Sequence, residues 1–243
     1  CNEDIPFGAK NTLSGLKLPE KVNKLRPYVV LVKVDCNELS SSSNGDSNAL
    51  SNATPKELYD KALELYSQDD VEGAVELLFA SIEKEPHAPA YYVLAYIAVN
   101  DYDNYEFARE KLRYCIEQEY ALGDSYGLLA KSYYYEDDYE SAIKYYDKAI
   151  QEEPNNVDYR YRRGLCKYRQ KNYDAAISDF KKALVFEDEV EYDYYADVYS
   201  YCGNAMYRSD NPEATEYLKK AIELNPTTLT PWSILGHIWS EQE

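Results

Sequence analysis

The chain has 243 residues and a formal net charge of −18, with 44 acidic against 26 basic side chains. Binding to nucleic-acid phosphates or to an anionic membrane surface needs clustered cations, so this composition argues against both kinds of partner. It favours a basic protein or peptide, unless the charge serves solubility alone. No run of apolar residues is long enough to span a membrane.

The first 36 residues lack helical periodicity, and residues 28–34 are rich in β-branched side chains, which predicts a strand. The chain begins at Cys1 and continues with polar and acidic residues. This start resembles that of mature bacterial lipoproteins, whose first cysteine carries the lipid. The resemblance implies lipid attachment at Cys1, which would be the chain's one link to a membrane, and a location in the bacterial cell envelope. An arbitrary fragment boundary and a cytoplasmic location are the alternatives.

Residues 37–54 are rich in Ser and Asn, and such a composition cannot bury enough apolar surface to fold alone. They predict a flexible linker between residues 1–36 and the remainder of the chain. A helix is expected directly afterwards. Thr54 and Glu57 have the spacing of a capping box, and Pro55 suits the first position of a helix.

From residue 55 onward one pattern recurs, mostly every 34 residues: an alanine, a large apolar residue four positions later and a small residue seven positions later. These offsets place the three side chains on one face of a helix. A proline twelve residues after three of the alanines is expected to end that helix. The alanines are Ala74, Ala108, Ala142, Ala176 and Ala214, the large residues are Leu78, Leu112, Tyr146, Phe180 and Leu218, and the prolines are Pro86, Pro154 and Pro226.

Another helix is predicted before each alanine, because apolar residues there recur at spacings of three, four and seven. One such face consists of Tyr126, Leu129, Ala130 and Tyr133. The last consists of Trp232, Leu235, Gly236 and Trp239, and both tryptophans are expected to be buried against the preceding unit.

The stretch from Tyr126 to Pro154 closely resembles the tetratricopeptide repeat, whose 34-residue pattern runs aromatic, Leu-Gly, Tyr, Ala, Phe, Ala, Pro. The resemblance extends over residues 55–243, although Arg160 and Lys167 replace aromatic residues in the fourth unit. It implies an all-α superhelix, or solenoid, of about five helix pairs plus a closing helix, preceded by a short, partly β segment. The expected units are 55–88, 89–122, 123–156, 157–194 and 195–228, with the final helix at 229–243.

Members of this family bind extended peptides or partner helices on the concave face formed by the first helix of each pair. The resemblance implies the same face here, and a partner with apolar anchors and some basic residues would suit it. Packing between helices is the alternative role for its tyrosines. The expected contact residues are Tyr59, Tyr66, Tyr134, Tyr161, Tyr168, Asn204, Tyr207, Asp124, Asp158 and Asp197, and the same frame also exposes Ile97, Lys131 and Leu165.

Repeats of this family that hold the acidic C-terminus of heat-shock chaperones use a clamp of lysines, asparagines and an arginine. The corresponding positions here are Tyr59, Leu63, Leu94, Asp124 and Leu128. No binding of such an acidic tail is therefore expected.

Three arginines, Arg160, Arg162 and Arg163, form a positive cluster in the fourth unit. Such a cluster could hold a carboxylate of a partner. The favoured interpretation is structural, with the arginines paired to acids such as Asp124 or Glu191.

Nothing in the sequence predicts catalysis, a metal or a cofactor. The two histidines, His87 and His237, lie 150 residues apart, and there is no glycine-rich phosphate loop. Cys115, Cys166 and Cys202 are expected to be buried small residues rather than disulfide partners or metal ligands.

The sequence therefore predicts a non-enzymatic scaffold that binds a partner protein or peptide. Two alternatives stay open: a constitutive structural subunit of a larger assembly, such as one associated with the cell envelope, and a regulatory repeat region of a larger enzyme.

Overall fold

The computed structural model describes residues 52–186 and 194–240. Within these ranges the fold is all-α, as predicted, and the helices divide between two compact units, residues 1–121 and 122–243. Cys1, the predicted strand at 28–34 and nearly all of the predicted linker lie outside the described residues.

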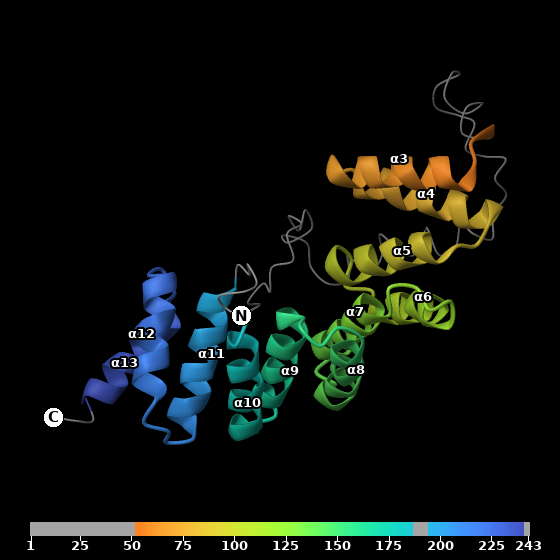
Figure 1. Ribbon diagram of the computed structural model, residues 1–243. Coiled ribbons are helices and arrows are strands. Elements are labelled where there is room, and N and C mark those ends of the chain that lie inside the picture. Colours follow the sequence, from red (N-terminus) through yellow and green to blue (C-terminus); the bar gives the residue numbers. More distant parts are fainter. Residues whose placement is uncertain (1–51, 187–193, 241–243) are drawn as a thin grey trace. The chain divides into compact units, whose positions relative to one another are not determined.

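The described part of the first unit consists of two helix pairs. In each pair the two helices pack side by side, and α4 also contacts α5 (Figure 1). The helices are α3 (Pro55–Ser67), α4 (Val71–Lys84), α5 (Ala88–Asn100) and α6 (Tyr105–Glu117).

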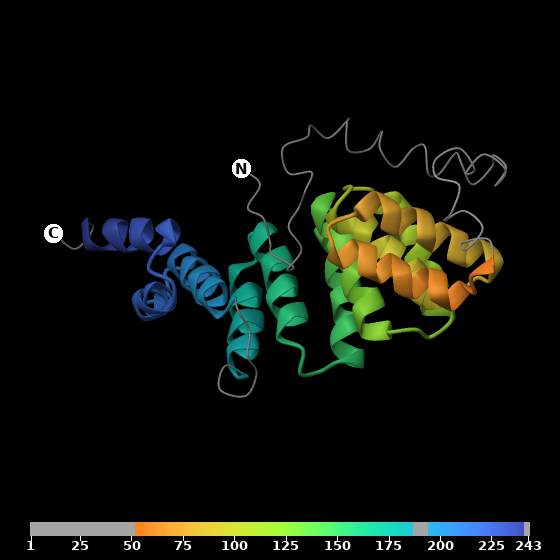
Figure 2. The ribbon, with the colours of Figure 1, turned by 90° about the horizontal axis from the view of Figure 1, so that it is seen from above.

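The second unit continues with three further pairs and one more helix, and each helix packs on the next. The last helix, α13, contacts both α12 and α11, and Figure 2 shows it as the outermost helix of this unit. The helices are α7 (Leu122–Tyr135), α8 (Tyr139–Glu152), α9 (Val157–Arg169), α10 (Tyr173–Leu184), α11 (Tyr195–Arg208), α12 (Ala214–Leu224) and α13 (Leu229–Ser240).

Four of the five pairs use the same tight turn between their helices. One turn residue has a left-handed backbone, and the next residue caps the second helix by accepting a hydrogen bond from a backbone N–H three positions later. Aspartate tolerates left-handed φ values better than most residues, which explains how a chain with only 9 glycines makes these turns. The left-handed residues are Asp69, Asp103, Asp137 and Lys171, and the caps are Asp70, Asn104, Asp138 and Asn172.

The ends of the helices follow the predicted signals. Thr54 and Glu57 form a capping box, in which the Glu57 N–H donates to the Thr54 hydroxyl oxygen and the Thr54 N–H donates to the Glu57 carboxylate. Each predicted proline stands two residues after the end of a second helix, where it prevents the helix from continuing. These prolines are Pro86, Pro154 and Pro226.

The recurring alanine, large residue and small residue form the core of every pair, as predicted. In the fourth pair, Ala176, Phe180 and Ala183 are all 0% exposed, and the equivalent residues of the other four second helices are equally well buried. The flanking small residues let the neighbouring helices approach, while the large residue fills the space between them.

The first helices receive that large residue in a notch lined by glycine or alanine. A Cβ atom added at Gly164 would lie 2.6 Å from the Phe180 ring, and one added at Gly203 would lie 2.8 Å from Leu218. In α7 the equivalent residue is Ala130, which packs in the same core cluster as Tyr146. A larger side chain at these positions would separate the two helices of a pair.

The expectation that both tryptophans are buried is wrong. Trp232 is 48% exposed and Trp239 is 49% exposed, whereas Leu235 and Ile234 of the same helix pack against Leu218. The aromatic positions of a first helix pack against the second helix of its own pair rather than against the preceding pair. The described residues include no second helix after α13.

The three described cysteines are buried and free, as predicted, and burial raises the pKa of each thiol to about 12. The thiolate is the reactive form. With Cys1 and Cys36 replaced by serine, we expect the native chain to react with a disulfide reagent at pH 8 at least about 100-fold more slowly than the unfolded chain. Fast labelling of a native thiol would contradict this burial.

The same thiols should make stability depend on pH. In the unfolded chain they ionise near pH ~8.5, whereas the fold holds them protonated up to about 12. The unfolded state then binds fewer protons than the native state, so the free energy of unfolding should fall as the pH rises above ~8.5.

Candidate functional site

A tyrosine near the end of a first helix is hydrogen-bonded by a residue at the end of the next first helix. In the second unit, the Arg169 Nε donates to the Tyr134 hydroxyl at 3.4 Å, and the Arg208 Nε donates to the Tyr168 hydroxyl at 3.1 Å. All three first helices from α7 to α11 therefore meet along one row of side chains, which we call the tyrosine row: Tyr134, Arg169, Tyr168, Arg208 and Tyr207.

The first unit repeats this arrangement with a different partner. The Tyr66 hydroxyl donates to the Asp101 carboxylate at 2.9 Å, and the ring of Tyr66 meets Tyr96 edge-on. Burial, and then the charge of Asp101, raise the pKa of Tyr66 well above its ordinary value. Asp101 is 3% exposed, so this contact ties α3 to α5 rather than presenting an acid to solvent.

The tyrosine row ends at a hollow between α11 and α13, with a volume of about 400 Å³. Asn204 and Tyr207 were predicted for this surface, and the structure brings them together there. The sequence does not single out the other five lining residues: the family frame places no partner contacts on the last helix, which supplies four of them, and Arg208 of α11 is not one of the frame's contact positions. The complete lining is Asn204, Tyr207, Arg208, Thr230, Ser233, Ile234 and His237.

Two of the three predicted aspartates are used within the fold. Asp124 accepts a hydrogen bond from the Tyr159 hydroxyl at 2.8 Å, and Asp158 forms an ion pair with Arg162 at 2.6 Å. Arg162 is only 4% exposed, so its partner carboxylate is held in place by a buried charge. Asp197 is half-buried on α11. Of these three carboxylates, Asp158 is therefore neutralised by a cation, whereas Asp124 is exposed and binds an uncharged hydroxyl.

Tyr161 does not lie on an accessible surface. It is 4% exposed and packs against Phe180 and Tyr201, with ring centroids 6.0 and 6.2 Å apart. Three other residues that the family frame places on this face are also buried: Ile97, Lys131 and Leu165 are at most 3% exposed. The frame positions that do stay accessible include Leu63, which is 37% exposed, and Asp124 at the start of α7. Tyr59 is half-buried in the first unit, where its ring meets that of His87.

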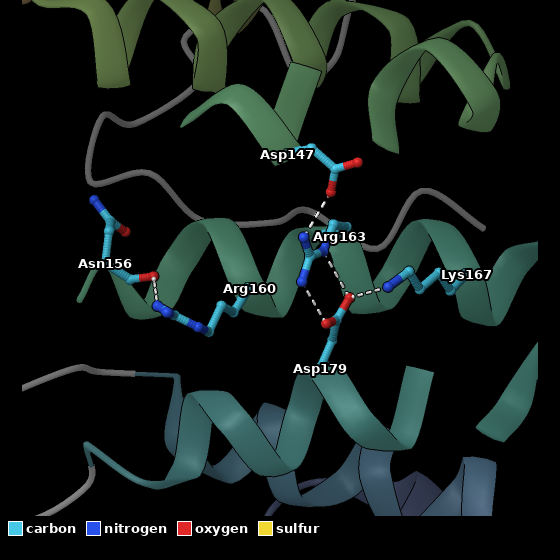
Figure 3. A network of polar contacts seen from close by, with 6 residues as sticks. All are labelled: Asp147, Asn156, Arg160, Arg163, Lys167 and Asp179. Atoms are coloured by element: carbon cyan, nitrogen blue, oxygen red, sulfur yellow. Dashed lines mark hydrogen bonds and ion pairs between the residues drawn. The ribbon is translucent and has the colours of Figure 1, made fainter. Parts of the chain in front are cut away.

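The arginine cluster has a structural role, as the favoured interpretation held, but with different partners. Arg163 makes two hydrogen bonds to Asp179 of α10, at 2.8 and 2.6 Å, and a third to Asp147 of α8 at 2.6 Å (Figure 3). The Lys167 ammonium lies 2.7 Å from the same Asp179 carboxylate. Although burial opposes the charged guanidinium, these acids keep the pKa of Arg163 above its ordinary value.

The remaining members of the cluster bind locally. Arg160 donates to the backbone carbonyl of Asn156 at 3.4 Å, as Figure 3 shows, and its guanidinium lies 5.4 Å from the Phe186 ring centroid. Arg162 pairs with Asp158. Glu191, the other predicted partner, lies outside the described residues, and Asp124 binds Tyr159 instead.

Comparison with known proteins agrees with this arrangement. Residues 128–193 match the family model of the tetratricopeptide repeat. This segment therefore consists of tetratricopeptide-repeat sequence. The matched region includes the notch at Gly164 and the polar network around Asp179, so the departures at Arg160 and Lys167 do not remove the fourth unit from the family.

Several solved tetratricopeptide-repeat structures share the fold at low sequence identity. MamA from Desulfovibrio magneticus superimposes with a TM-score of 0.63 at 15% identity, covering 72% of this chain and 96% of MamA. YrrB, described as having an unusual peptide-binding site, superimposes with a TM-score of 0.60 at 22% identity. The match covers 72% of this chain and 89% of YrrB. A tetratricopeptide-repeat protein of Thermus thermophilus superimposes with a TM-score of 0.54 at 20% identity. The match covers 75% of this chain and 99% of that protein.

One curated relative is similar over a short stretch of the chain. The Hsp70-Hsp90 organising protein of Plasmodium falciparum is 34% identical over 59 residues, which make up 24% of this chain. The match spans only 10% of that relative's length.

No group of three or more His, Cys, Asp or Glu side chains in residues 52–186 and 194–240 lies close enough to hold a metal ion. His87 contacts the Ser81 hydroxyl at 2.8 Å, but Ser81 also donates to the Pro55 carbonyl, so this pair connects two helices. None of the described helices is both long and apolar enough to cross a membrane.

Proposed function

We propose that this chain is a non-enzymatic interaction scaffold whose tyrosine row and adjoining hollow bind an extended segment of a partner protein. The observation that carries this proposal is the row from Tyr134 to Tyr207, with half-buried tyrosines and exposed arginines, which continues into the hollow between α11 and α13. Tyrosine suits such a surface because it offers a rigid apolar ring and a polar tip at a low entropic cost.

The hydrogen bonds along the row support preorganisation. Arg208 Nε donates to both the Tyr168 hydroxyl and the Asn204 side-chain oxygen, which fixes the wall of the hollow before a partner arrives. A surface that is already ordered loses little conformational freedom on binding. The peptide-binding site described for YrrB, a protein of the same fold, supports the general class of function.

The proposed partner segment carries apolar anchors for the ring faces and hydrogen-bond acceptors for the hollow. Arg208, Thr230, Ser233 and His237 can all donate there. The preference for basic partner residues keeps the exposed Asp124 as support but loses Asp158, which already pairs with Arg162. The absence of binding to an acidic chaperone tail stays a prediction, as does lipid attachment at Cys1.

The test is a selection of displayed random peptides on the immobilised chain, followed by calorimetric titration of the selected peptides. We expect an enriched sequence with apolar anchors, and at least about tenfold weaker binding to a chain with Tyr168→Ala and Tyr207→Ala. Arg208→Ala should also weaken binding. Its side chain is exposed, so this change tests the surface without touching the core.

Tyr217→Ala is the matched control, because Tyr217 is a half-buried tyrosine on α12, away from the row. It should leave peptide affinity unchanged. Selected peptides that bind the double variant as tightly as the parent chain would remove the proposed site from this face. Far-ultraviolet circular dichroism checks that each variant is folded.

A further inference from the structure

The last helix, α13, has the residue pattern of a first helix. Its Trp232, Leu235, Gly236 and Trp239 stand at the spacing of Tyr126, Leu129, Ala130 and Tyr133 in α7, and of Tyr199, Cys202, Gly203 and Met206 in α11. Each earlier first helix in the second unit pairs with a second helix that follows it in the chain.

In those pairs the corresponding residues contact the second helix. Tyr126 and Tyr133 stack on Tyr145 of α8, with ring centroids 6.4 and 5.4 Å apart. Tyr199 packs on Tyr217 of α12, at 5.6 Å. The notches at Gly164 and Gly203 hold Phe180 and Leu218, as described above. The aromatic positions and the notch are therefore the docking surface for a helix.

In α13 the same surface is open. A Cβ atom added at Gly236 would have no atom within 4 Å, and Trp232 and Trp239 on either side of it are each about half exposed. The surface lies on the side of α13 away from Thr230 and Ile234, which line the hollow. It continues, in register, the interface that joins the helices of the three preceding pairs. We call it the α13 slot: Trp232, Gly236 and Trp239.

We propose that the α13 slot docks an amphipathic helix of a second protein, in the place that a second helix takes in the other pairs. The chain itself shows which side chains fit, because every second helix presents a small, a large apolar and a small residue at positions i, i+4 and i+7. The docked helix carries the same three kinds of residue at these positions. This site is separate from the tyrosine row and does not depend on it.

Charge favours a foreign helix over a second copy of this chain. The chain carries a net charge of −18, and Glu241 and Glu243 follow α13 directly in the sequence. Two copies brought together at this end would repel each other, whereas a neutral or basic helix would not. The docked helix should have about three turns, since α8, α10 and α12 have 14, 12 and 11 residues.

The probe is a helix-stabilised synthetic peptide that copies α12, Ala214–Leu224. It contains no tryptophan, while the only two tryptophans of the chain both lie in the slot, so tryptophan emission reports on the slot alone. Titration into the 243-residue chain should give a saturable blue shift. A peptide with Leu218→Asp should bind at least about tenfold more weakly, because the large apolar residue fills the notch.

Gly236→Leu in the chain fills the notch and should weaken binding of the unmodified peptide at least about tenfold. The open space around Gly236 lets the variant fold normally, which circular dichroism can verify. Glu140→Leu, at an exposed position of α8, is the control for an added leucine and should leave the affinity unchanged. These two variants also separate docking in the slot from exchange of the peptide with the chain's own α12.

Several results would overturn the proposal. One is the absence of a saturable emission change up to millimolar peptide. Another is that the parent chain binds the unmodified and the Leu218→Asp peptide with equal affinity, or that the Gly236→Leu chain binds the unmodified peptide as tightly as the parent chain does. A third is concentration-dependent dimerisation of the free chain that Gly236→Leu abolishes, measured by sedimentation equilibrium, since the occupant would then be a second copy.

Discussion

Asp179→Ala should lower the free energy of unfolding by about 3–5 kcal/mol, because it leaves two cations in a largely buried interface without their shared carboxylate. The Asp179 side chain is 2% exposed, and Arg163 and Lys167, which bind it, are 16% and 20% exposed. Urea denaturation followed by circular dichroism measures the change. A loss below about 1 kcal/mol would show that the network is not a significant part of the fold.

Asp147→Ala is the matched control. It removes a single contact to Arg163, and the Asp147 side chain is 47% exposed, so the loss should stay below about 1 kcal/mol. A triple change takes the comparison further. Arg163→Leu, Lys167→Tyr and Asp179→Tyr install the apolar residues that the third pair has at Leu129, Tyr133 and Tyr145. Replacing a whole buried ionic network in this way should be neutral or stabilising.

Phe180→Ala should lower the free energy of unfolding by about 3–5 kcal/mol. The ring is 0% exposed, fills the notch at Gly164 and contacts Tyr161 and Tyr201. Thermal and urea unfolding of the variant would measure the loss, and a change smaller than about 1 kcal/mol would contradict the packing described for this pair.

The effect of Gly164→Ala on the free energy of unfolding should have opposite signs in the parent chain and in the Phe180→Ala variant. With Phe180 present, the added methyl group meets the ring at 2.6 Å and should destabilise the fold. In the Phe180→Ala variant the methyl group enters the vacated space, and alanine has a higher helix propensity than glycine. Gly164→Ala should therefore stabilise the fold of this variant. Gly236→Ala, which meets no atom, should stabilise the parent chain by up to about 1 kcal/mol. Additive effects of Gly164→Ala and Phe180→Ala would exclude their contact.

The sequence was sufficient for the all-α repeat fold and for its core. The alanine, large residue and small residue at positions such as Ala176, Phe180 and Ala183 have one structural explanation, and the structure buries them all. The capping box at Thr54 and the terminating prolines were also predictable, because each depends only on residues a few positions apart. Local signals repeated at a fixed period reinforce one another.

The accessible surface was harder to predict than the core. Whether a residue of a helix is exposed depends on how the neighbouring helices are tilted against that helix. The 34-residue period of the sequence does not specify this tilt. Tyr161 and Lys131 were therefore placed on a binding face, although the neighbouring helices cover them. The pairing of Asp158 with Arg162 could have been anticipated, since the two are four residues apart on one helix.

The tryptophan error has a different cause. Trp232 and Trp239 match the aromatic positions of the repeat, and those positions are buried only where a second helix follows. The motif specifies a contact surface, and whether the surface is covered depends on a further element. The same observation, interpreted with the structure, led to the proposed slot on α13.

The links between helix pairs in the second unit join immediate neighbours. Tyr134 binds Arg169, Tyr159 binds Asp124 and Tyr168 binds Arg208, and in each case one pair holds the next. Mechanical tension applied at the two ends of this unit would therefore load one junction after another in series. Stretched in an optical trap, it should lengthen in successive small steps, each the release of a single pair, rather than in one rupture.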